Sequence, residues 1–303
     1  MTAGTTHQRL DRSVRATITG MIINAVLAAG KITAGALGHS QALIADGIES
    51  LADIVSSIVV WRGVVVAAVP EDEDHPYGHG KAEAVAAGVV GVLLGSAAIW
   101  IAVESLHQII TPHQTPATFT LVVLVVVIVV KELLFRRVLQ TGHELENVAV
   151  KGDAWHHRSD AITSFAAGVG IVVALAGGPG YEWADDAAAL LASLFIAWNG
   201  VRIGRPAMDE LMDAAAPKEF RNHVSAVAAA VTDVERIEKC IVRRHGYWFY
   251  VDLHVEVDPQ MTVARSHAIA HEVKDRLRSE LPRIRDVLIH IEPSRRSRDT
   301  GSA

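Results

Sequence analysis

Six long apolar stretches fill the first two thirds of the chain. They span residues 16–37, 43–69, 84–110, 117–135, 154–176 and 184–204. Each reaches or approaches the roughly 20 residues that a helix needs to cross the hydrocarbon core of a lipid bilayer. The run FTLVVLVVVIVV at 119–130 is the clearest, because only lipid or a deep protein core would accommodate it. The pattern predicts an α-helical membrane protein with six transmembrane helices, contained in a domain of residues 1–213.

After Pro217 the pattern changes to that of a soluble domain. The expected helices and strands are a helix over 218–231, strands over 237–244 and 247–257, a helix over 262–280 and a strand over 286–292. The segment YWFYVDLHVEV alternates apolar and polar residues as a half-buried strand does. The order α-β-β-α-β predicts a small α+β domain of residues 214–293, with helices on one face of a sheet. The polar tail, residues 294–303, is predicted to be disordered.

Basic residues occur only in alternate connections between the apolar stretches. The connections 38–42, 111–116 and 177–183 contain no lysine or arginine. The basic residues on the other side are Arg9, Arg12, Arg15, Lys81, Arg136, Arg137, Lys151, Arg202 and Arg205. Because basic loops stay in the cytosol, we expect both termini to be cytosolic.

The composition agrees with a membrane protein. Half of the 303 residues are apolar, only 20% are charged, and the mean hydropathy is +0.27. The formal net charge of -6 argues against a nucleic-acid binder, which would normally be basic. The single cysteine, Cys240, excludes an internal disulfide framework and a CxxC metal motif. The first fifteen residues are polar, so no cleavable signal peptide is expected.

Two of the apolar stretches, the second and the fifth, carry groups of acidic and imidazole residues at helical spacing. Asp46, Glu49 and Asp53 fall within about 60° of one another on one face of the second helix. His156 and Asp160 lie four residues apart in the fifth, one turn above the other. Ionisable groups inside a span usually mark an ion or proton path, because burying them is costly. Two facing helices that each offer an i, i+4 pair would surround one metal ion with four ligands.

The four ligands of this hypothesis are Glu49, Asp53, His156 and Asp160. Such a nitrogen and oxygen donor set suits Zn²⁺, and oxygen-rich sites also suit Fe²⁺ or Mn²⁺. The alternative is that the carboxylates only pair with Lys31 and Arg62 or extend to the membrane interface. Asp46 is expected to cap its helix or relay protons, with a ligand role left open. His157 points about 100° away from its neighbour, which indicates helix packing.

A second cluster lies in the segment PEDEDHPYGHGKAE at 70–83. Asp72, His75 and His79 have the short spacing of a loop metal site. Pro76 and Gly78 provide the turn that would let the two imidazoles converge. The alternative is an ordinary solvated acidic loop.

A third cluster of imidazoles and carboxylates lies in the C-terminal domain. Its members are Asp252, His254 and Glu256 on one strand, His267 and His271 on a helix, and His290 and Glu292 on the last strand. A single histidine on a protein surface usually has no metal-binding role. The joint occurrence of these groups in one small domain nevertheless favours metal binding.

Together, these features resemble the cation diffusion facilitators, a family of divalent-metal/proton antiporters. The resemblance rests on the six helices, the loop HPYGHGKAE, the intramembrane acidic pair, the HxxxD of the fifth helix and the α-β-β-α-β domain. It implies a homodimer in the lipid bilayer, protons as the counter-substrate and a metallochaperone-like cytosolic fold. It also implies Zn²⁺, Fe²⁺ or Mn²⁺ as substrate and regulatory ligand, without an organic cofactor.

The resemblance assigns roles to the three clusters and to one charge pair. The transport site would be Glu49, Asp53, His156 and Asp160; the loop site Asp72, His75 and His79; the cytosolic site His254, His267, His290 and Glu292; and the dimer-hinge pair Lys81 and Asp213. Two departures matter. Glu49 stands where the family often has aspartate, which could alter the choice of metal. Glu238 replaces a common histidine of the first strand, with Cys240 expected on the same strand face, so a second cytosolic metal is in doubt.

The sequence therefore predicts a secondary transporter, not an enzyme, in the inner (cytoplasmic) membrane. It would export a divalent transition metal in exchange for protons, with Zn²⁺ ahead of Fe²⁺, Mn²⁺, Co²⁺ and Cd²⁺. One alternative is a passive metal channel. Another is a membrane-tethered metalloenzyme, which would require HExxH or a comparable set. Neither His143-Glu144 nor His271-Glu272 completes one.

Overall fold

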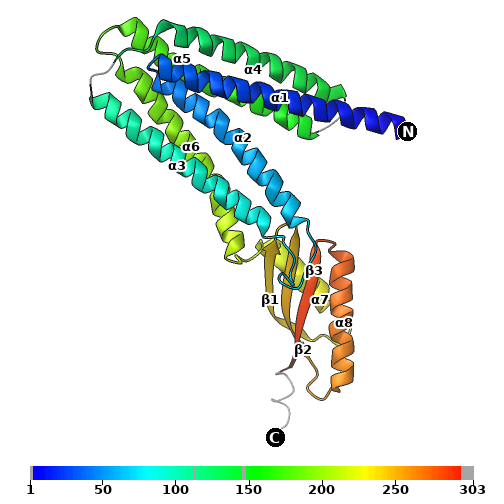
Figure 1. Cartoon of the computed structure of the whole chain (residues 1–303). Helices are drawn as coiled ribbons and strands as arrows, with labels where there is room; N and C mark the ends of the chain where they lie inside the picture. Colours follow the sequence, from blue (N-terminus) through cyan, green and yellow to red (C-terminus); the bar gives the residue numbers. More distant parts are fainter. Residues whose placement is uncertain (1–2, 112–113, 145–147, 295–303) are drawn as a thin grey trace. The chain divides into compact units, whose positions relative to one another are not determined.

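The computed structural model describes residues 3–111, 114–144 and 148–294. Eight helices and one three-stranded sheet make up the described chain (Figure 1). The six long helices are α1 (Ala3–Leu37), α2 (Gln41–Ala67), α3 (Ala82–Ile110), α4 (Thr118–Glu144), α5 (Val148–Gly177) and α6 (Trp183–Leu211). All six contain a stretch long and apolar enough to span a membrane, so the predicted class is confirmed. The tail beyond Ser294, predicted to be disordered, lies outside the described residues.

The helices extend further than the apolar stretches that predicted them. The helix α4 continues to Glu144, although its apolar stretch ends near residue 135. The helix α6 continues to Leu211 and passes through Pro206. Hydropathy marks the part of a helix that faces lipid, whereas the polar turns outside the bilayer remain helical without an apolar signal.

Much of the surface of the long helices is apolar. Large side chains such as Val92, Ile99 and Leu191 are about two-thirds exposed. A soluble monomer rarely exposes contiguous apolar surface on this scale. Surrounding lipid would cover it, which agrees with six membrane-spanning helices.

Within the membrane domain, α4 and α5 pack side by side, with α1 against both. Buried Leu124 of α4 and Ile171 of α5 form one small core with Leu43 of α2. The helix α2 approaches α1 closely at Gly47, where an added Cβ would lie 2.6 Å from the Ile32 side chain and 3.0 Å from its backbone nitrogen. A residue with a side chain would push these helices apart, so the glycine allows polar groups on α1 and α2 to meet.

The C-terminal domain has the predicted order of elements. They are α7 (Lys218–Ala229), β1 (Arg236–His245), β2 (Trp248–Val257), α8 (Val263–Glu280) and β3 (Ile284–Pro293). The strands lie in the order β1-β2-β3, with β1 antiparallel and β3 parallel to β2. Apolar residues of both helices and one sheet face form a continuous core, exemplified by Val227, Leu253 and Ile269. This leaves the polar residues of β2 and β3 on the other face.

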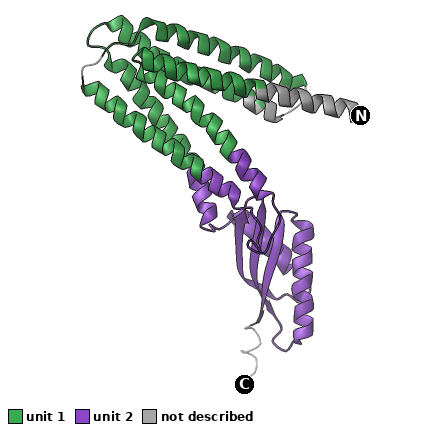
Figure 2. Cartoon of the chain, in the orientation of Figure 1, with its two compact units in different colours: residues 1–59, 89–203 green, residues 60–88, 204–303 purple. Residues whose placement is uncertain are grey.

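The structure divides into two compact units, residues 1–59 with 89–203 and residues 60–88 with 204–303 (Figure 2). The C-terminal ends of α2 and α6 and the N-terminal end of α3 therefore group with the C-terminal domain. The domain boundary after residue 213 follows the change in composition and remains a prediction.

Candidate metal centres

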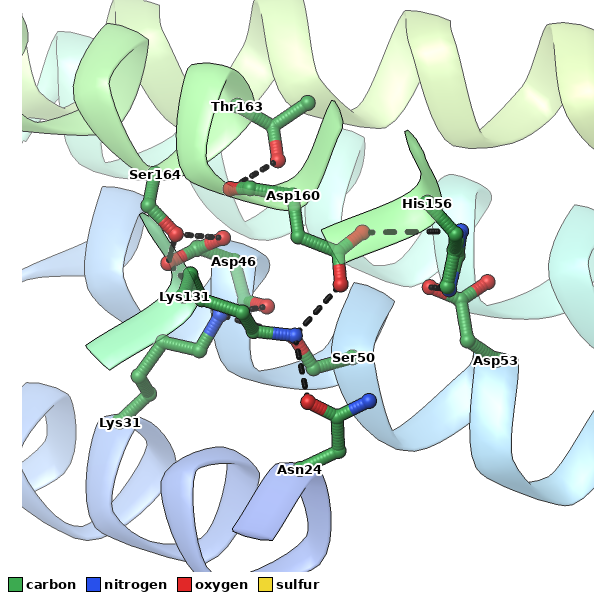
Figure 3. Close-up of polar contacts among 10 residues, drawn as sticks. All are labelled: Asn24, Lys31, Asp46, Ser50, Asp53, Lys131, His156, Asp160, Thr163 and Ser164. Atoms are coloured by element: carbon green, nitrogen blue, oxygen red, sulfur yellow. Dashed lines mark hydrogen bonds and ion pairs between the residues drawn. The ribbon is translucent and has the colours of Figure 1, made fainter. Parts of the chain in front are cut away.

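The first candidate centre joins α2 and α5 inside the membrane domain (Figure 3). Asp53, His156 and Asp160 offer ligand atoms that all lie within 4.8 Å of one another. The imidazole of His156 lies between the two carboxylates, with Nε2 3.7 Å from Asp53 Oδ2 and Nδ1 3.8 Å from Asp160 Oδ1. The i, i+4 spacing of His156 and Asp160 produces this geometry directly, because α5 is helical throughout. We call these three residues the membrane triad.

Glu49 is not part of this three-residue group. It lies one helical turn before Asp53 on α2 and lines a cavity of about 220 Å³ together with Asp46 and Thr163. The structure therefore brings together three of the four predicted transport ligands. The Glu49 carboxylate is thus not among the three groups whose ligand atoms lie within 4.8 Å of one another.

A lysine that the sequence analysis overlooked contacts the triad. Lys131 of α4 is 1% exposed, and its Nζ donates hydrogen bonds to Asp160 Oδ2 at 2.5 Å and to Asn24 Oδ1 at 2.8 Å (Figure 3). Its signal in the sequence was a charged residue directly after the uncharged run of residues 119–130. An ionisable residue at that depth indicates a functional group by default.

Asp46 belongs to a separate polar cluster. Lys31 of α1 is fully buried and lies 2.9 Å from Asp46 Oδ2. Its ammonium also donates to Ser50 Oγ at 2.8 Å, and Ser164 Oγ donates to the Asp46 carboxylate (Figure 3). The sequence analysis gave pairing with Lys31 as the alternative to metal binding, and Asp46 does form this pair. The guanidinium of Arg62, the other suggested partner, lies over the ring of Trp61.

The second candidate centre lies in the loop between α2 and α3. Ligand atoms of Asp72, His75 and His79 lie within 4.8 Å of one another. Asp72 Oδ1 accepts the backbone N–H of His75 at 2.6 Å, and Asp72 Oδ2 lies 3.4 Å from His79 Nε2. Desolvation raises the pKa of the Asp72 carboxyl, but hydrogen bonds from the His75 backbone and imidazole outweigh it, so the net pKa is lowered. The predicted turn does bring these groups together.

The loop between α2 and α3 contacts the C-terminal domain within one compact unit. Arg285 of β3 forms an ion pair with Glu71 at 2.6 Å, which lowers the pKa of that carboxyl. The hydroxyl of Tyr250 donates to the Tyr77 carbonyl. The predicted hinge pair is also in contact, since Lys81 Nζ lies 2.9 Å from Asp213 Oδ1. The role of that pair in a dimer remains a prediction.

The third candidate centre lies on the polar face of the sheet. His254, His290 and Glu292 offer ligand atoms within 4.8 Å of one another. The His254 Nδ1 lies 2.6 Å from Glu292 Oε1, and His290 Nε2 lies 3.6 Å from the same oxygen. The parallel register places His254 directly beside His290, which explains why the two imidazoles share a face. Glu238 Oε2 lies 3.5 Å from His254 Nδ1 and extends the cluster.

Within a single chain, His267 does not lie near His254, His290 and Glu292. It lies on the exposed side of α8, with its Nε2 3.2 Å from His271 Nε2. The buried side of α8 packs on the sheet through Ile269, Val273 and Leu277. The described residues of one chain therefore supply three of the four predicted cytosolic ligands.

The expectation that Cys240 shares a strand face with Glu238 is wrong. The pairing of β1 with β2 shifts register between Ile237 and Lys239, and Cys240 pairs with Leu253, a core residue. An irregularity of this kind reverses the alternation that the sequence predicts. Burial raises the pKa of the Cys240 thiol, which further disfavours a thiolate ligand.

Comparison with known proteins identifies the two domains. Residues 17–212 match the cation efflux transmembrane domain, and residues 216–294 match the cation efflux protein cytoplasmic domain. The manganese efflux system protein MneP of Bacillus subtilis is 30% identical over 94% of this chain and 98% of its own length. The metal tolerance protein C1 of Arabidopsis thaliana is 32% identical over 91% of this chain and 61% of its own length.

The magnetosome protein MamB of a Magnetospira species is 30% identical over 86% of this chain and 88% of its own length. A solved structure of a variant MamM C-terminal domain is 22% identical, covers 25% of this chain and 94% of its own, and has a TM-score of 0.25. The family match and the full-length relatives together show that the chain belongs to the cation diffusion facilitators, which are divalent-metal efflux transporters of the membrane.

Proposed function

We propose that this protein exports a divalent transition metal from the cytosol in exchange for protons, with the membrane triad and Glu49 as its transport site. The observation that supports this most strongly is the placement of His156 between two carboxylates inside a membrane domain. Like charges gathered there are costly unless a cation compensates them. A divalent metal ion provides that compensation.

Zn²⁺ is the proposed substrate. For a given nitrogen and oxygen site, Zn²⁺ lies above Fe²⁺ and Mn²⁺ in the usual order of affinity, and imidazole is a favourable zinc ligand. Mn²⁺ is the second candidate, followed by Fe²⁺, Co²⁺ and Cd²⁺. Two observations favour Mn²⁺: the triad has two carboxylates for one imidazole, and the relative MneP is a manganese efflux protein.

Proton coupling follows from the ligand chemistry. Metal ligation requires ionised carboxylates and a neutral imidazole, so metal binding releases protons. When the site opens to a more acidic outer side, protonation of the same groups would release the metal. We place the protein in the inner membrane with both termini in the cytosol, because the basic residues flank only that side of the helices.

The other two centres are proposed as regulatory metal sites of a homodimer. The loop site would use Asp72, His75 and His79. The cytosolic site would use His254, His290 and Glu292, with His267 supplied across the two-fold axis, because one chain does not bring it to the cluster. Metal bound at such a site would stabilise the dimer by mass action.

The test is reconstitution of the full-length protein into liposomes with a panel of Zn²⁺, Mn²⁺, Fe²⁺, Co²⁺ and Cd²⁺. Metal flux and lumenal pH are recorded in the same vesicles. We expect metal movement to be accompanied by opposite proton movement and to be fastest with Zn²⁺. Metal flux without any proton movement would instead establish a passive channel, and Mn²⁺ outcompeting Zn²⁺ at equal concentration would establish the second candidate.

A further inference from the structure

Lys131 is the one cation in direct contact with the membrane triad among the residues that the structure describes. Its ammonium has two partners, Asp160 Oδ2 and Asn24 Oδ1, which belong to different helices. The side chain is almost completely buried, so water does not compete for it. The Lys131 ammonium is therefore a covalently attached cation that lies beside the proposed site for a metal cation (Figure 3).

The charges of the triad explain why the two cations would exclude each other. Lys131 offsets part of the negative charge of Asp53 and Asp160, and it does so through the Asp160 carboxylate that the metal would bind. An ammonium and a divalent ion on the same carboxylate repel each other strongly in a medium of low dielectric constant.

Geometry gives the same answer. Asp160 Oδ2 is occupied by Lys131 at hydrogen-bond distance, and Asp160 Oδ1 faces His156. A metal ion that used both carboxylate oxygens, or Oδ2 alone, would have to share Oδ2 with the ammonium. Asn24 Oδ1, already in contact with Nζ, offers the displaced ammonium an acceptor on α1.

We propose that Lys131 is a built-in counter-cation that holds Asp160 while the transport site is empty. It releases Asp160 and keeps its contact with Asn24 when a divalent metal binds. It lowers the affinity of the site and so allows release of the metal. It also neutralises part of the empty site, so that the site can return across the membrane without a bound metal. This inference rests on the proposed function, because it takes the triad as the transport site.

The experiment measures Zn²⁺ binding by calorimetry on the full-length protein in detergent. The loop and cytosolic sites are first silenced with His75→Ala, His79→Ala and His290→Ala, so that the triad dominates the isotherm. In this background, Lys131→Met is expected to tighten Zn²⁺ binding by about tenfold or more, which corresponds to about 1.4 kcal/mol. In liposomes, the same substitution is expected to slow maximal efflux, because release becomes harder.

Two further substitutions keep the test decisive if Lys131→Met does not fold. Asn24→Leu removes the acceptor for the displaced ammonium and is expected to weaken Zn²⁺ binding, which is the opposite direction. Lys131→Arg keeps the charge and is expected to bind Zn²⁺ no more tightly than the parent protein. The matched control is Lys31→Met combined with Asp46→Asn, since Lys31 is also fully buried but pairs with Asp46, and the double substitution leaves neither charge unpaired. Its Zn²⁺ affinity should stay within about twofold of the parent.

The outcomes separate the two proposals. If the parent protein neither binds nor exports any metal of the panel, the proposed function fails. If the parent is active but Lys131→Met binds Zn²⁺ no more tightly, or the Lys31→Met/Asp46→Asn control tightens binding equally, only the role of Lys131 is overturned. If Lys131→Met does not fold, an unchanged Zn²⁺ affinity of Asn24→Leu overturns the proposed role of Lys131.

Discussion

The membrane triad and the cluster on the β2–β3 face use the same chemistry in opposite surroundings. In both, carboxylates and imidazoles offer ligand atoms within 4.8 Å of one another. In the membrane, Asp160 is buried and held by a lysine. On the sheet, the side chain of His290 is 66% exposed, and no lysine or arginine ion pair to Glu292 is seen among the described residues. Asp160 is thus compensated by a lysine, although the side chains of His156 and Asp53 in the triad are 45% and 38% exposed. Glu292, by contrast, has imidazoles as its ion-pair partners among the described residues.

This difference has energetic consequences. Removing a partner from a buried pair leaves a charge that water cannot reach, which typically costs about 3–5 kcal/mol. Removing a partner from an exposed cluster lets water replace the lost contact, so the cost is small. The same type of substitution should therefore have large effects in the membrane domain and mainly metal-dependent effects in the C-terminal domain.

The largest effect is expected from His156→Ala. This substitution removes the imidazole that lies between the Asp53 and Asp160 carboxylates and that is the triad's nitrogen ligand. Loss of a supporting partner alone typically costs 10–100-fold in metal affinity or activity, so loss of a ligand should reduce efflux by more than about 100-fold. Asp53→Ala is expected to do the same. Vesicle flux assays measure this, with gel filtration as the control for folding. Near-normal flux in both variants would remove the triad from the transport path.

Asp46→Asn should act on stability instead of metal binding. It removes the counter-charge of fully buried Lys31, and we expect a loss of about 3–5 kcal/mol of stability. Thermal unfolding in detergent measures the loss, and Zn²⁺ calorimetry on the remaining folded protein should show affinity close to wild type. A stable variant that has lost Zn²⁺ binding would make Asp46 a ligand.

Residues 214–294, expressed alone, should gain stability from Zn²⁺. The segment has its own hydrophobic core, and a ligand that binds only the folded state contributes about 2.7 kcal/mol at a hundredfold excess over Kd. We expect calorimetry to show a higher Tm and ultracentrifugation to show tighter dimerisation. His290→Ala should remove most of the response. Cys240→Ser is the matched control and should retain it, because Cys240 faces the core. A wild-type domain without any zinc-dependent shift would show the cluster to be ordinary surface charge.

Glu49→Asp should have a moderate effect on selectivity. Glu49 lies one turn from Asp53 and outside the three closest ligands, so a shorter side chain changes its reach without removing a triad ligand. We expect a changed ratio of Zn²⁺ to Mn²⁺ or Fe²⁺ efflux with transport retained. The ratio is measured by competition in vesicles. Complete loss of transport would place Glu49 among the essential ligands.

The smallest effect on stability is expected at Lys81 and Asp213. Both side chains are partly exposed, at 34% and 45%, and such pairs are worth about 0–1 kcal/mol. A double-mutant cycle with Lys81→Ala and Asp213→Ala should give a coupling energy in that range. A coupling of several kcal/mol would indicate that a dimer buries the pair.

The fold could be predicted almost completely, because apolar length and strand alternation report burial directly. The site was predictable where one helix carries both partners, as with His156 and Asp160. Contacts between separate helices were harder to predict. The sequence named Lys31 only as an alternative partner for the carboxylates of the second helix, and it gave no sign that Lys131 contacts Asp160. Alternation also failed at Cys240, where a local register shift in β1 changes the face. Sequence spacing describes neighbours within one element, whereas these features depend on how separate elements meet.

The most direct measurement of the central claim is an experimental structure of the full-length protein with Zn²⁺ bound. The account predicts a metal ion about 2.0–2.2 Å from Asp53, His156 and Asp160. It also predicts that the Lys131 ammonium has left Asp160 and remains with Asn24. Zn²⁺ found only in the loop and on the sheet, with Lys131 still bound to Asp160 at saturating metal, would contradict the account.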